Sequence, residues 1–385
     1  MKSYRKIYNP NYLYVITFMF PFVIYSLQWS TLYPPLSASL LLFYLGSFII
    51  YLLTGYLSNR LKPFYFNRIS KSSYNTLFVS IILALYLGEI ILFRKIPLFG
   101  LLRGDFTYGD QFGIPVIHTI LVSFNSFYAV YLFHQYISKK NKVLLLQFLL
   151  LLLPYILLVY RSNIMGLFVS CFFIFLLNNR ITYKIIFTSI VAILLLFYGF
   201  GFLGNLRSGQ GDSTYIARAS GATDQFLESF VPKEYYWTYL YVASPVANLQ
   251  NNINMTKQDE GGWKVLVLNE CFPDFMIKFL PFLHREEKSF YQINSFLNVG
   301  TIYVYSFSFL RWKGMMFMFF YFLIFINAYY WVLYRSTRFR VVGMALLFNL
   351  IIFANFHNTI SYSASSLQLL YPVVFSFLQA KTRII

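Results

Sequence analysis

Five ionisable side chains lie inside or at the ends of long apolar segments: Glu89, His118, Arg161, Arg207 and His357. A charged group in such a segment is costly to bury and by default marks a functional site or a buried pair. A carboxylate or an imidazole can accept a proton from a hydroxyl, and an arginine offers a planar, always protonated donor to an anion. These residue types suit acid–base chemistry or anion binding.

Each of these side chains also has an ordinary structural interpretation. Arg161 and Arg207 suit interfacial anchors whose long side chains extend to water. His118 and His357 suit packing or hydrogen-bonding roles, and Glu89 suits a buried pair with a loop arginine. The sequence leaves both interpretations open for each residue.

No cofactor motif accompanies these residues. The chain has no phosphate-binding glycine loop, no dinucleotide fingerprint, no paired His and Glu zinc motif and no Gly-x-Ser-x-Gly elbow. Its acids and histidines lack metal-ligand spacing, and its two cysteines, Cys171 and Cys271, lie far apart. The sequence therefore predicts neither a metal ion nor an organic cofactor.

Membrane helices are the elements that must position this chemistry. Of the 385 residues, 58% are hydrophobic and 11% are charged, whereas soluble proteins carry about a quarter charged residues. A helix needs roughly 20 mainly apolar residues to cross a bilayer. We therefore predict an all-α polytopic integral membrane protein with ten transmembrane helices. The ten segments are 12–32, 36–57, 74–93, 114–136, 143–160, 163–177, 184–203, 312–334, 341–357 and 364–379.

The distribution of charge predicts the orientation. Placing the N-terminus in the cytoplasm gives the inner segments 17 of the 31 Lys and Arg residues and none of the 13 acids, as the positive-inside rule requires. The net charge of +18 comes from short clusters between apolar segments, so no nucleic-acid partner is expected. Both termini are predicted to be cytoplasmic, and the first segment is predicted to be a retained anchor.

Two segments are expected on the outer side. Residues 205–311 form a large extracytoplasmic loop between seven helices in 1–204 and three in 312–385, and this loop holds ten of the thirteen acids. Within this loop, residues 291–310 are apolar enough to cross the membrane. A crossing there would move five cations of the later segments to the outer side, against the positive-inside rule: Arg335, Arg338, Arg340, Lys381 and Arg383. We therefore predict that 291–310 is an interfacial or re-entrant piece. A second outer loop, 94–113, is rich in aromatics and glycines. Long loops are usually functional, so the chemistry is expected outside.

Five local stretches carry a family resemblance. They are Tyr108-Gly-Asp-Gln-Phe-Gly-Ile-Pro115 with His118 behind it, Arg161-Ser-Asn-Ile-Met-Gly166, Gly201-Phe-Leu-Gly-Asn-Leu-Arg207, Tyr239-Leu-Tyr-Val-Ala-Ser-Pro-Val-Ala-Asn-Leu249 and Asn298-Val-Gly-Thr-Ile-Tyr303. With the topology, they resemble bacterial oligosaccharide repeat-unit polymerases of the Wzy type, which extend O-antigen and capsule chains. The resemblance covers most of the chain. Where members often have Asp-Phe-Gly, this chain has Ser306-Phe-Ser308.

The resemblance implies glycosyl transfer at the outer face of the bacterial cytoplasmic (inner) membrane. A growing glycan on undecaprenyl diphosphate would be moved onto the non-reducing sugar of another lipid-linked repeat unit. The implied partners are the lipid-linked oligosaccharide and the lipid bilayer, with a chain-length regulator protein as a further candidate. Arginines suit the negative charge that develops on the diphosphate. We expect Arg161, Arg207 and Arg218 in this role, Asp212, Glu89 or His357 as general base, and Arg103, Asp105, His118 and Arg311 as substrate-binding residues.

Three alternatives stay open. A ligase that joins a finished glycan to another acceptor would use the same leaving group and similar arginines. A flippase or other transporter for lipid-linked oligosaccharides would show ionisable groups at mid-membrane and short loops on both sides. A sugar acyltransferase would draw its acyl donor from the cytoplasmic side, where the sequence shows no chemistry.

Overall fold

The computed structural model is all-helical over the residues that it describes, and no β-strand occurs among them. The predicted all-α fold class is therefore confirmed for this part of the chain. Two predicted site residues, Asp105 and Asp212, lie outside the described ranges. These ranges are 8–61, 64, 66–103, 112–179, 182–208, 214–278, 285–286, 289–334 and 338–382.

Five helices in the described ranges are long and apolar enough to cross a membrane, judged by length and composition. These five support a helical membrane protein, whereas ten spans stay a prediction. They are α2 (Ala38–Leu61), α3 (Asn75–Phe93), α7 (Arg161–Asn178), α8 (Tyr183–Ser208) and α14 (Val304–Tyr334). The other predicted segments coincide with α1 (Pro10–Tyr25), α5 (Ile117–Lys139), α6 (Lys142–Leu157), α15 (Arg340–Phe353) and α16 (Ser363–Thr382).

Helix α2 illustrates how these helices pack. Leu40, Tyr44 and Tyr51 are buried at helical spacing, whereas the side chains of Leu42 and Leu53 are more than half exposed. A face of exposed leucines suits contact with lipid tails, while close helix contacts favour small residues. Gly55 supplies one such contact, because a Cβ there would lie 2.5 Å from the ring of Tyr12 on α1.

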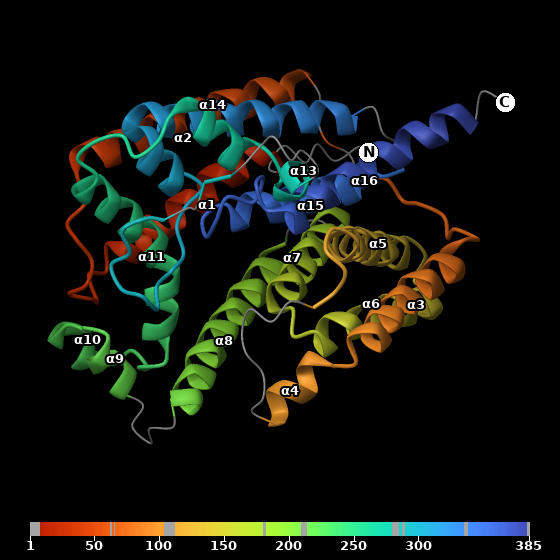
Figure 1. Ribbon diagram of the computed structural model, residues 1–385, viewed down its shortest axis with the longest axis horizontal. Coiled ribbons are helices and arrows are strands. Elements are labelled where there is room, and N and C mark those ends of the chain that lie inside the picture. Colours follow the sequence, from red (N-terminus) through yellow and green to blue (C-terminus); the bar gives the residue numbers. More distant parts are fainter. Residues whose placement is uncertain are drawn as a thin grey trace.

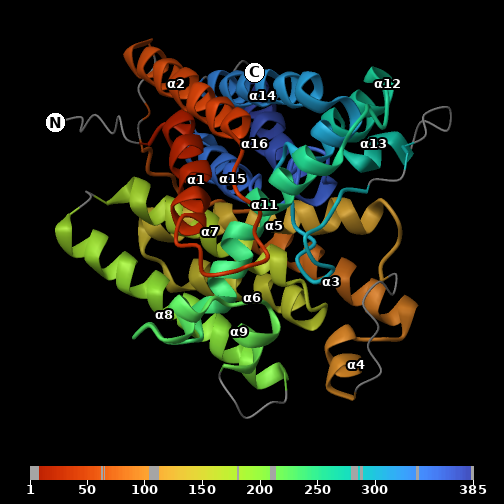
Figure 2. The same cartoon turned by 90° about the vertical axis from the view of Figure 1, so that its left-hand side faces the viewer.

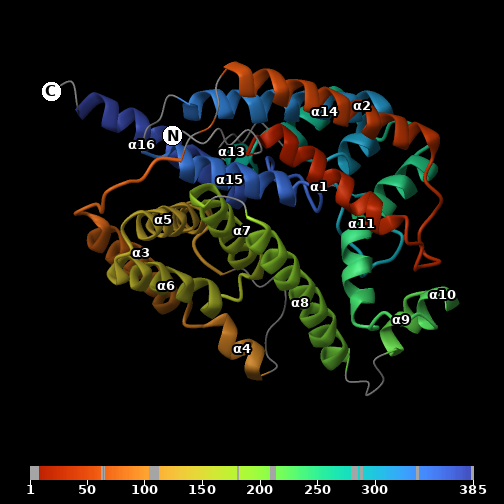
Figure 3. The ribbon, with the colours of Figure 1, turned by 180° about the vertical axis from the view of Figure 1, so that it is seen from behind.

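Helix α15 lies at the centre of the bundle. Its residues from Val341 to Ile351 are buried, and it packs against α1, α5, α7, α14 and α16. Figure 1 shows α1, α2, α14 and α15 running side by side in the upper part of the molecule, with α3, α5 and α6 below. Figure 3 shows the same two groups from behind.

Helix α8 stands apart from the other apolar helices. Only 6% of its most apolar window is buried, and Figure 2 shows it at the periphery of the molecule. Its main contacts are with α11 (Tyr235–Met255) and α9 (Tyr215–Ala219). Gly201 allows the contact with α11, because a Cβ there would lie 1.8 Å from the carbonyl oxygen of Glu234.

The segment predicted as a large loop is mostly helical where it is described. The 21-residue helix α11 is its longest element, and the sequence did not predict it. The other helices of this segment are α9, α10 (Asp224–Leu227), α12 (Trp263–Leu266), the π-helix η1 (Val267–Cys271) and α13 (Asp274–Lys278), while α4 (Pro97–Arg103) lies in the other predicted loop.

The predicted interfacial piece 291–310 is irregular up to Tyr303 and helical from Val304. Side-chain amides of α11 hold its irregular part in place. Asn248 Nδ2 donates to the carbonyl oxygens of Leu297 and Val299 at 2.6 and 2.7 Å. Asn252 Oδ1 accepts from the backbone N–H of Tyr291 at 3.1 Å.

Helix α14 is kinked near its start. Leu310 and Arg311 have non-helical dihedral angles, with φ of 50° at Arg311, so the chain turns sharply where the sequence predicts the eighth span to begin. Gly314 fits this kink, since a Cβ there would lie 2.0 Å from the carbonyl oxygen of Ser306. Ser306 and Ser308 are buried, and the Ser308 hydroxyl donates to Oδ1 of Asn252 on α11 at 3.1 Å.

Candidate functional site

Three helix ends converge on His118, the second residue of α5. Its Nδ1 lies 2.7 Å from Oε2 of Glu89, on the last turn of α3. Its Nε2 lies 2.6 Å from the hydroxyl of Tyr160, which immediately precedes α7. A carboxylate can only accept, so Nδ1–H donates to Glu89; in the neutral imidazole, Nε2 then accepts from the Tyr160 hydroxyl. We call this arrangement the Glu89–His118–Tyr160 chain.

The carboxylate of Glu89 is buried, and each of its two oxygens accepts a hydrogen bond. Its side chain is 5% exposed and that of His118 is 12% exposed. The second oxygen, Oε1, accepts the backbone N–H of Ile114 at 3.1 Å. The rings of Tyr86 and Phe112 meet the imidazole edge-on. Hydrogen bonds are electrostatically stronger in such a poorly hydrated environment, so the imidazole is firmly oriented.

The backbone beside this chain adopts unusual conformations. Val116, just before α5, has φ of 71°, and Val159, just before Tyr160, has φ of 60°. A positive φ in a β-branched residue costs free energy and persists only where the surrounding structure imposes it. Gly113, with φ of 92°, gives the imidazole its space, because a Cβ there would lie 2.3 Å from Cγ of His118. Such strain clusters at functional sites.

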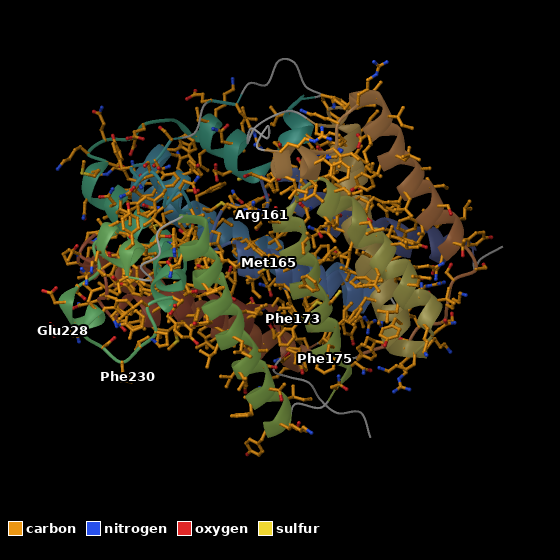
Figure 4. All side chains as sticks on the ribbon, turned by 90° about the horizontal axis from the view of Figure 1, so that it is seen from below. Arg161, Met165, Phe173, Phe175, Glu228 and Phe230 are labelled. Carbon is orange, nitrogen blue, oxygen red and sulfur yellow. The ribbon has the colours of Figure 1, made fainter. Side chains whose placement is uncertain are left out.

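The order carboxylate, imidazole, hydroxyl suits proton transfer. The carboxylate fixes the tautomer and stabilises the imidazolium that forms when Nε2 takes a proton. Arg161 directly follows Tyr160 and is exposed at the first turn of α7. A helix start and a guanidinium both favour an anion nearby. Figure 4 shows Arg161 at one end of α7, with Phe173 and Phe175 toward the other.

A small cavity with several polar side chains on its wall lies between α5, α7, α15 and α16. Its volume of about 40 Å³ is enough for a few water molecules. Three buried polar atoms on its wall have no protein partner in the described structure: Nε2 of His357, Oγ of Ser170 and Oδ1 of Asn349. Buried polar groups without protein partners are normally satisfied by ordered water. His357 therefore faces a site suited to water, and the ring of Tyr362 packs edge-on against it.

A second charged cluster lies at η1 and α13, and the sequence did not predict it. Glu270 is fully buried and accepts from Asn358 Nδ2 at 2.8 Å. Asp274 Oδ1 accepts the backbone N–H of Ser363 at 2.8 Å. Burial lowers the pKa of Arg285, while the charges of Asp274 and Glu270 act in the opposite direction. These bonds attach η1 and α13 to the segment that connects α15 with α16.

The remaining predicted site residues are dispersed. Arg218 is exposed on α9, whose neighbours are α8 and α11, whereas α7, which begins at Arg161, packs against α5, α6 and α15. Figure 1 shows α9 at the lower left of the molecule and α7 near its centre. Arg207 belongs to the last turn of α8. Arg103 ends α4 and Arg311 lies in the kink of α14, both exposed.

The structure thus brings together Glu89 and His118, to which the sequence assigned different roles. It adds Tyr160, which sequence reasoning missed. The available signal was its position in the short turn between two predicted helices, directly before Arg161. Phenol groups are abundant in this chain, which has 34 tyrosines, so residue type alone did not distinguish this one.

The chain was also compared with known proteins. No family model, no curated protein and no solved structure matches it.

Proposed function

We propose that this protein is a membrane glycosyltransferase that polymerises undecaprenyl-diphosphate-linked oligosaccharide repeat units into O-antigen or capsular polysaccharide. The observation that carries this proposal is the Glu89–His118–Tyr160 chain beside Arg161. It offers a proton acceptor with an exposed arginine next to it in the chain, at the end of three apolar helices. A lipid-diphosphate donor brings both its own leaving group and its own membrane anchor.

In the proposed reaction, a hydroxyl of the acceptor sugar attacks the anomeric carbon of the donor glycan. The new glycosidic bond forms as the bond between that carbon and the diphosphate oxygen breaks. The hydroxyl proton passes to the Tyr160 oxygen while the Tyr160 proton moves to Nε2 of His118, and Glu89 stabilises the imidazolium. The leaving group departs as undecaprenyl diphosphate, and Arg161 stabilises its negative charge.

The proposal places this chemistry at the outer face of the cytoplasmic membrane, with ten spans and both termini inside. Phe230, fully exposed after α10, then lies outside, and Lys139, exposed at the end of α5, lies inside. Phe230→Cys should react in intact cells with a membrane-impermeant maleimide, and Lys139→Cys should react only after lysis. The reverse result would move the proposed site to the cytoplasm and refute the proposal.

The native cysteines favour this labelling test. Cys171 and Cys271 are both buried. Burial and neighbouring Glu270 raise the pKa of the Cys271 thiol to about 12, so this thiol stays protonated near neutral pH. A protonated thiol reacts poorly with a maleimide, because the thiolate is the nucleophile. The unsubstituted protein should therefore give no signal before it is unfolded.

The activity itself is tested with purified protein and a defined lipid-diphosphate oligosaccharide. The expected result is a ladder of longer lipid-linked glycans in the wild type and loss of the ladder in His118→Ala. A ladder of normal length in His118→Ala would refute the proposed site.

The same experiment separates polymerase from ligase. A ligase would transfer the glycan only to a different acceptor, so it would give no ladder from the lipid-linked repeat unit alone. A flippase would form no new bond at all, and the lipid-linked substrate would be recovered unchanged.

A further inference from the structure

A second, larger cleft opens where α11 meets the connection between α1 and α2. Its volume is about 460 Å³, which lies in the range of small-molecule sites. Among the described residues, the wall contains no charged side chain; it consists of Thr31, Leu32, Tyr33, Pro34, Pro35, Asn251, Gln292 and Ile293. In Figure 1 these segments meet at the left side of the molecule, and Figure 2 shows the same side face-on, with the connection beside α11.

The wall of this cleft is held by specific bonds. Gln250 Oε1 accepts the backbone N–H of Ser37 at 2.8 Å, which fixes the α1–α2 connection to α11. The Tyr33 hydroxyl donates to the carbonyl oxygen of Leu240 at 2.7 Å, and the Tyr33 ring stacks on Tyr25 and Tyr239. Two consecutive prolines stiffen the wall further. The cleft is therefore largely formed before a ligand arrives.

Two side-chain amides in this wall keep polar atoms available. Asn251 Nδ2 donates to the carbonyl oxygen of Tyr291 at 2.9 Å, and its Oδ1 has no partner within the described ranges. Gln292 is exposed, and none of the described residues bonds its amide. An amide both donates and accepts, which matches the hydroxyl groups of a sugar. A phosphate would call for arginine or lysine, which this wall lacks.

We infer that the cleft of Asn251 and Gln292 is a binding subsite for a neutral stretch of glycan chain. Two wall residues, Tyr33 and Ile293, pack against the second apolar cluster, which contains Tyr25, Tyr239 and Leu297, whereas residues around the Glu89–His118–Tyr160 chain, such as Tyr86 and Tyr155, belong to the main core. The subsite therefore holds sugar residues away from the reacting end. Its role in chain extension rests on the proposed function, and its affinity for glycan does not.

The direct test measures binding to the wild-type protein in lipid nanodiscs. The probe is the source organism's own surface polysaccharide, released from its lipid by mild acid. The double variant Asn251→Ala/Gln292→Ala should weaken binding about tenfold, and Gln292→Ala alone about fivefold, because each lost hydrogen bond to a neutral group has a modest effect. Gln225→Ala is the matched control, since Gln225 is an exposed glutamine on α10 outside the cleft.

Three results would overturn the inference. They are unchanged binding in both cleft variants, an equal loss in Gln225→Ala, or displacement of the polysaccharide by inorganic pyrophosphate, which would identify an anion site. Gln292→Glu adds a charge test: it should bind the neutral chain within about threefold of the wild type, because a carboxylate still accepts from hydroxyls.

The consequence for chain length is measured separately in a deletion strain. Cleft variants should give shorter ladders while still forming the first linkage. If His118→Ala abolishes the ladder and the cleft variants leave binding and chain length unchanged, the subsite fails and the polymerase proposal stands. If His118→Ala leaves the ladder intact and the cleft variants lose polysaccharide binding, the polymerase proposal fails and the glycan-binding subsite stands.

Discussion

Replacing Tyr160 by phenylalanine is the sharpest test of the proposed chemistry. The change removes one oxygen, which lies 2.6 Å from Nε2 of His118, and keeps the ring. The phenylalanine ring would still occupy the space of the tyrosine ring, edge-on to the imidazole at 5.6 Å between ring centroids, and would leave Nε2 without the hydroxyl that relays the proton. Proton transfer by a positioned group contributes about 10²- to 10⁴-fold to a rate. We expect a loss of that size, which corresponds to about 3–5 kcal/mol in the activation barrier.

The structural cost of the same change is much smaller. A neutral hydrogen bond contributes about 0.5–1.5 kcal/mol to stability, so expression and thermal unfolding should change little. Tyr371→Phe is the matched control, because the Tyr371 hydroxyl bonds Oγ of Ser123 at 3.0 Å and the carbonyl oxygen of Ile120 at 3.2 Å, on the same helix as His118. It removes similar bonds to α5 without touching the imidazole.

The assay is single-turnover extension of a lipid-diphosphate oligosaccharide by purified protein, measured across a range of pH. Tyr160→Phe should lower the rate at every pH at which the wild type is active. A loss below about tenfold, or one equal to that of Tyr371→Phe, would show that Tyr160 only supports the fold, and the proposed proton path would be wrong.

Three other substitutions test the same structure. Glu89→Gln keeps the shape of the side chain but removes the charge that stabilises the imidazolium, so extension should fall by about 10²-fold or more while the protein stays folded; normal extension would exclude this role. Gly113→Ala places a Cβ 2.3 Å from His118 and should lower both activity and melting temperature, whereas Gly88→Ala, with open space around it, should change neither. Gly201→Ala places a Cβ 1.8 Å from the carbonyl oxygen of Glu234, the residue before α11, and should destabilise the fold by about 1–3 kcal/mol, measured by thermal unfolding in detergent. Gly199→Ala on the same helix meets nothing within 4 Å, and an equal loss there would show that the α8–α11 contact is not the cause.

Hydropathy located the apolar helices well because length and composition determine them. It placed their ends less well, as α1 shows. The predicted segment 12–32 includes polar and turn residues, whereas the helix begins at Pro10, where Asn9 Oδ1 accepts the backbone N–H of Asn11 at 2.9 Å, and ends at Tyr25. Side-chain capping and proline at the first turn set this start. The mean hydropathy of a segment registers neither the cap nor the position of the proline.

Helix α11 was missed for a different reason. Its second half carries Asn248, Gln250, Asn251, Asn252 and Asn254, which make it too polar for a hydropathy window. In the structure several of these amides are buried and bond the backbone of other segments. Buried amides are acceptable only when they are satisfied, and the sequence does not show which distant backbone groups satisfy them.

The sequence could not predict the pairing of Glu89 with His118, for a related reason. Both were identified as costly groups near helix ends, but the rotation of α3 relative to α5 decides whether they meet. The hydrophobic periodicity of a helix that is apolar on all sides carries little information about that rotation. The three arginines were expected to act together. The structure places α9, which carries Arg218, against α8, which carries Arg207, whereas the start of α7 with Arg161 lies in a different part of the molecule.

Stability alone gives a poor account of the Glu89–His118–Tyr160 chain. A buried polar pair contributes little net stability, because desolvation offsets the attraction. This one also coincides with two valines at positive φ and with a glycine whose space the imidazole fills. An apolar set of similar volume would pack the same three helix ends without any of these costs. The Tyr160 hydroxyl bonds Nε2 of His118, and Tyr160 directly precedes the exposed Arg161. Strained backbone and a buried polar chain occur together at many functional sites, and their coincidence here supports the proposed proton transfer.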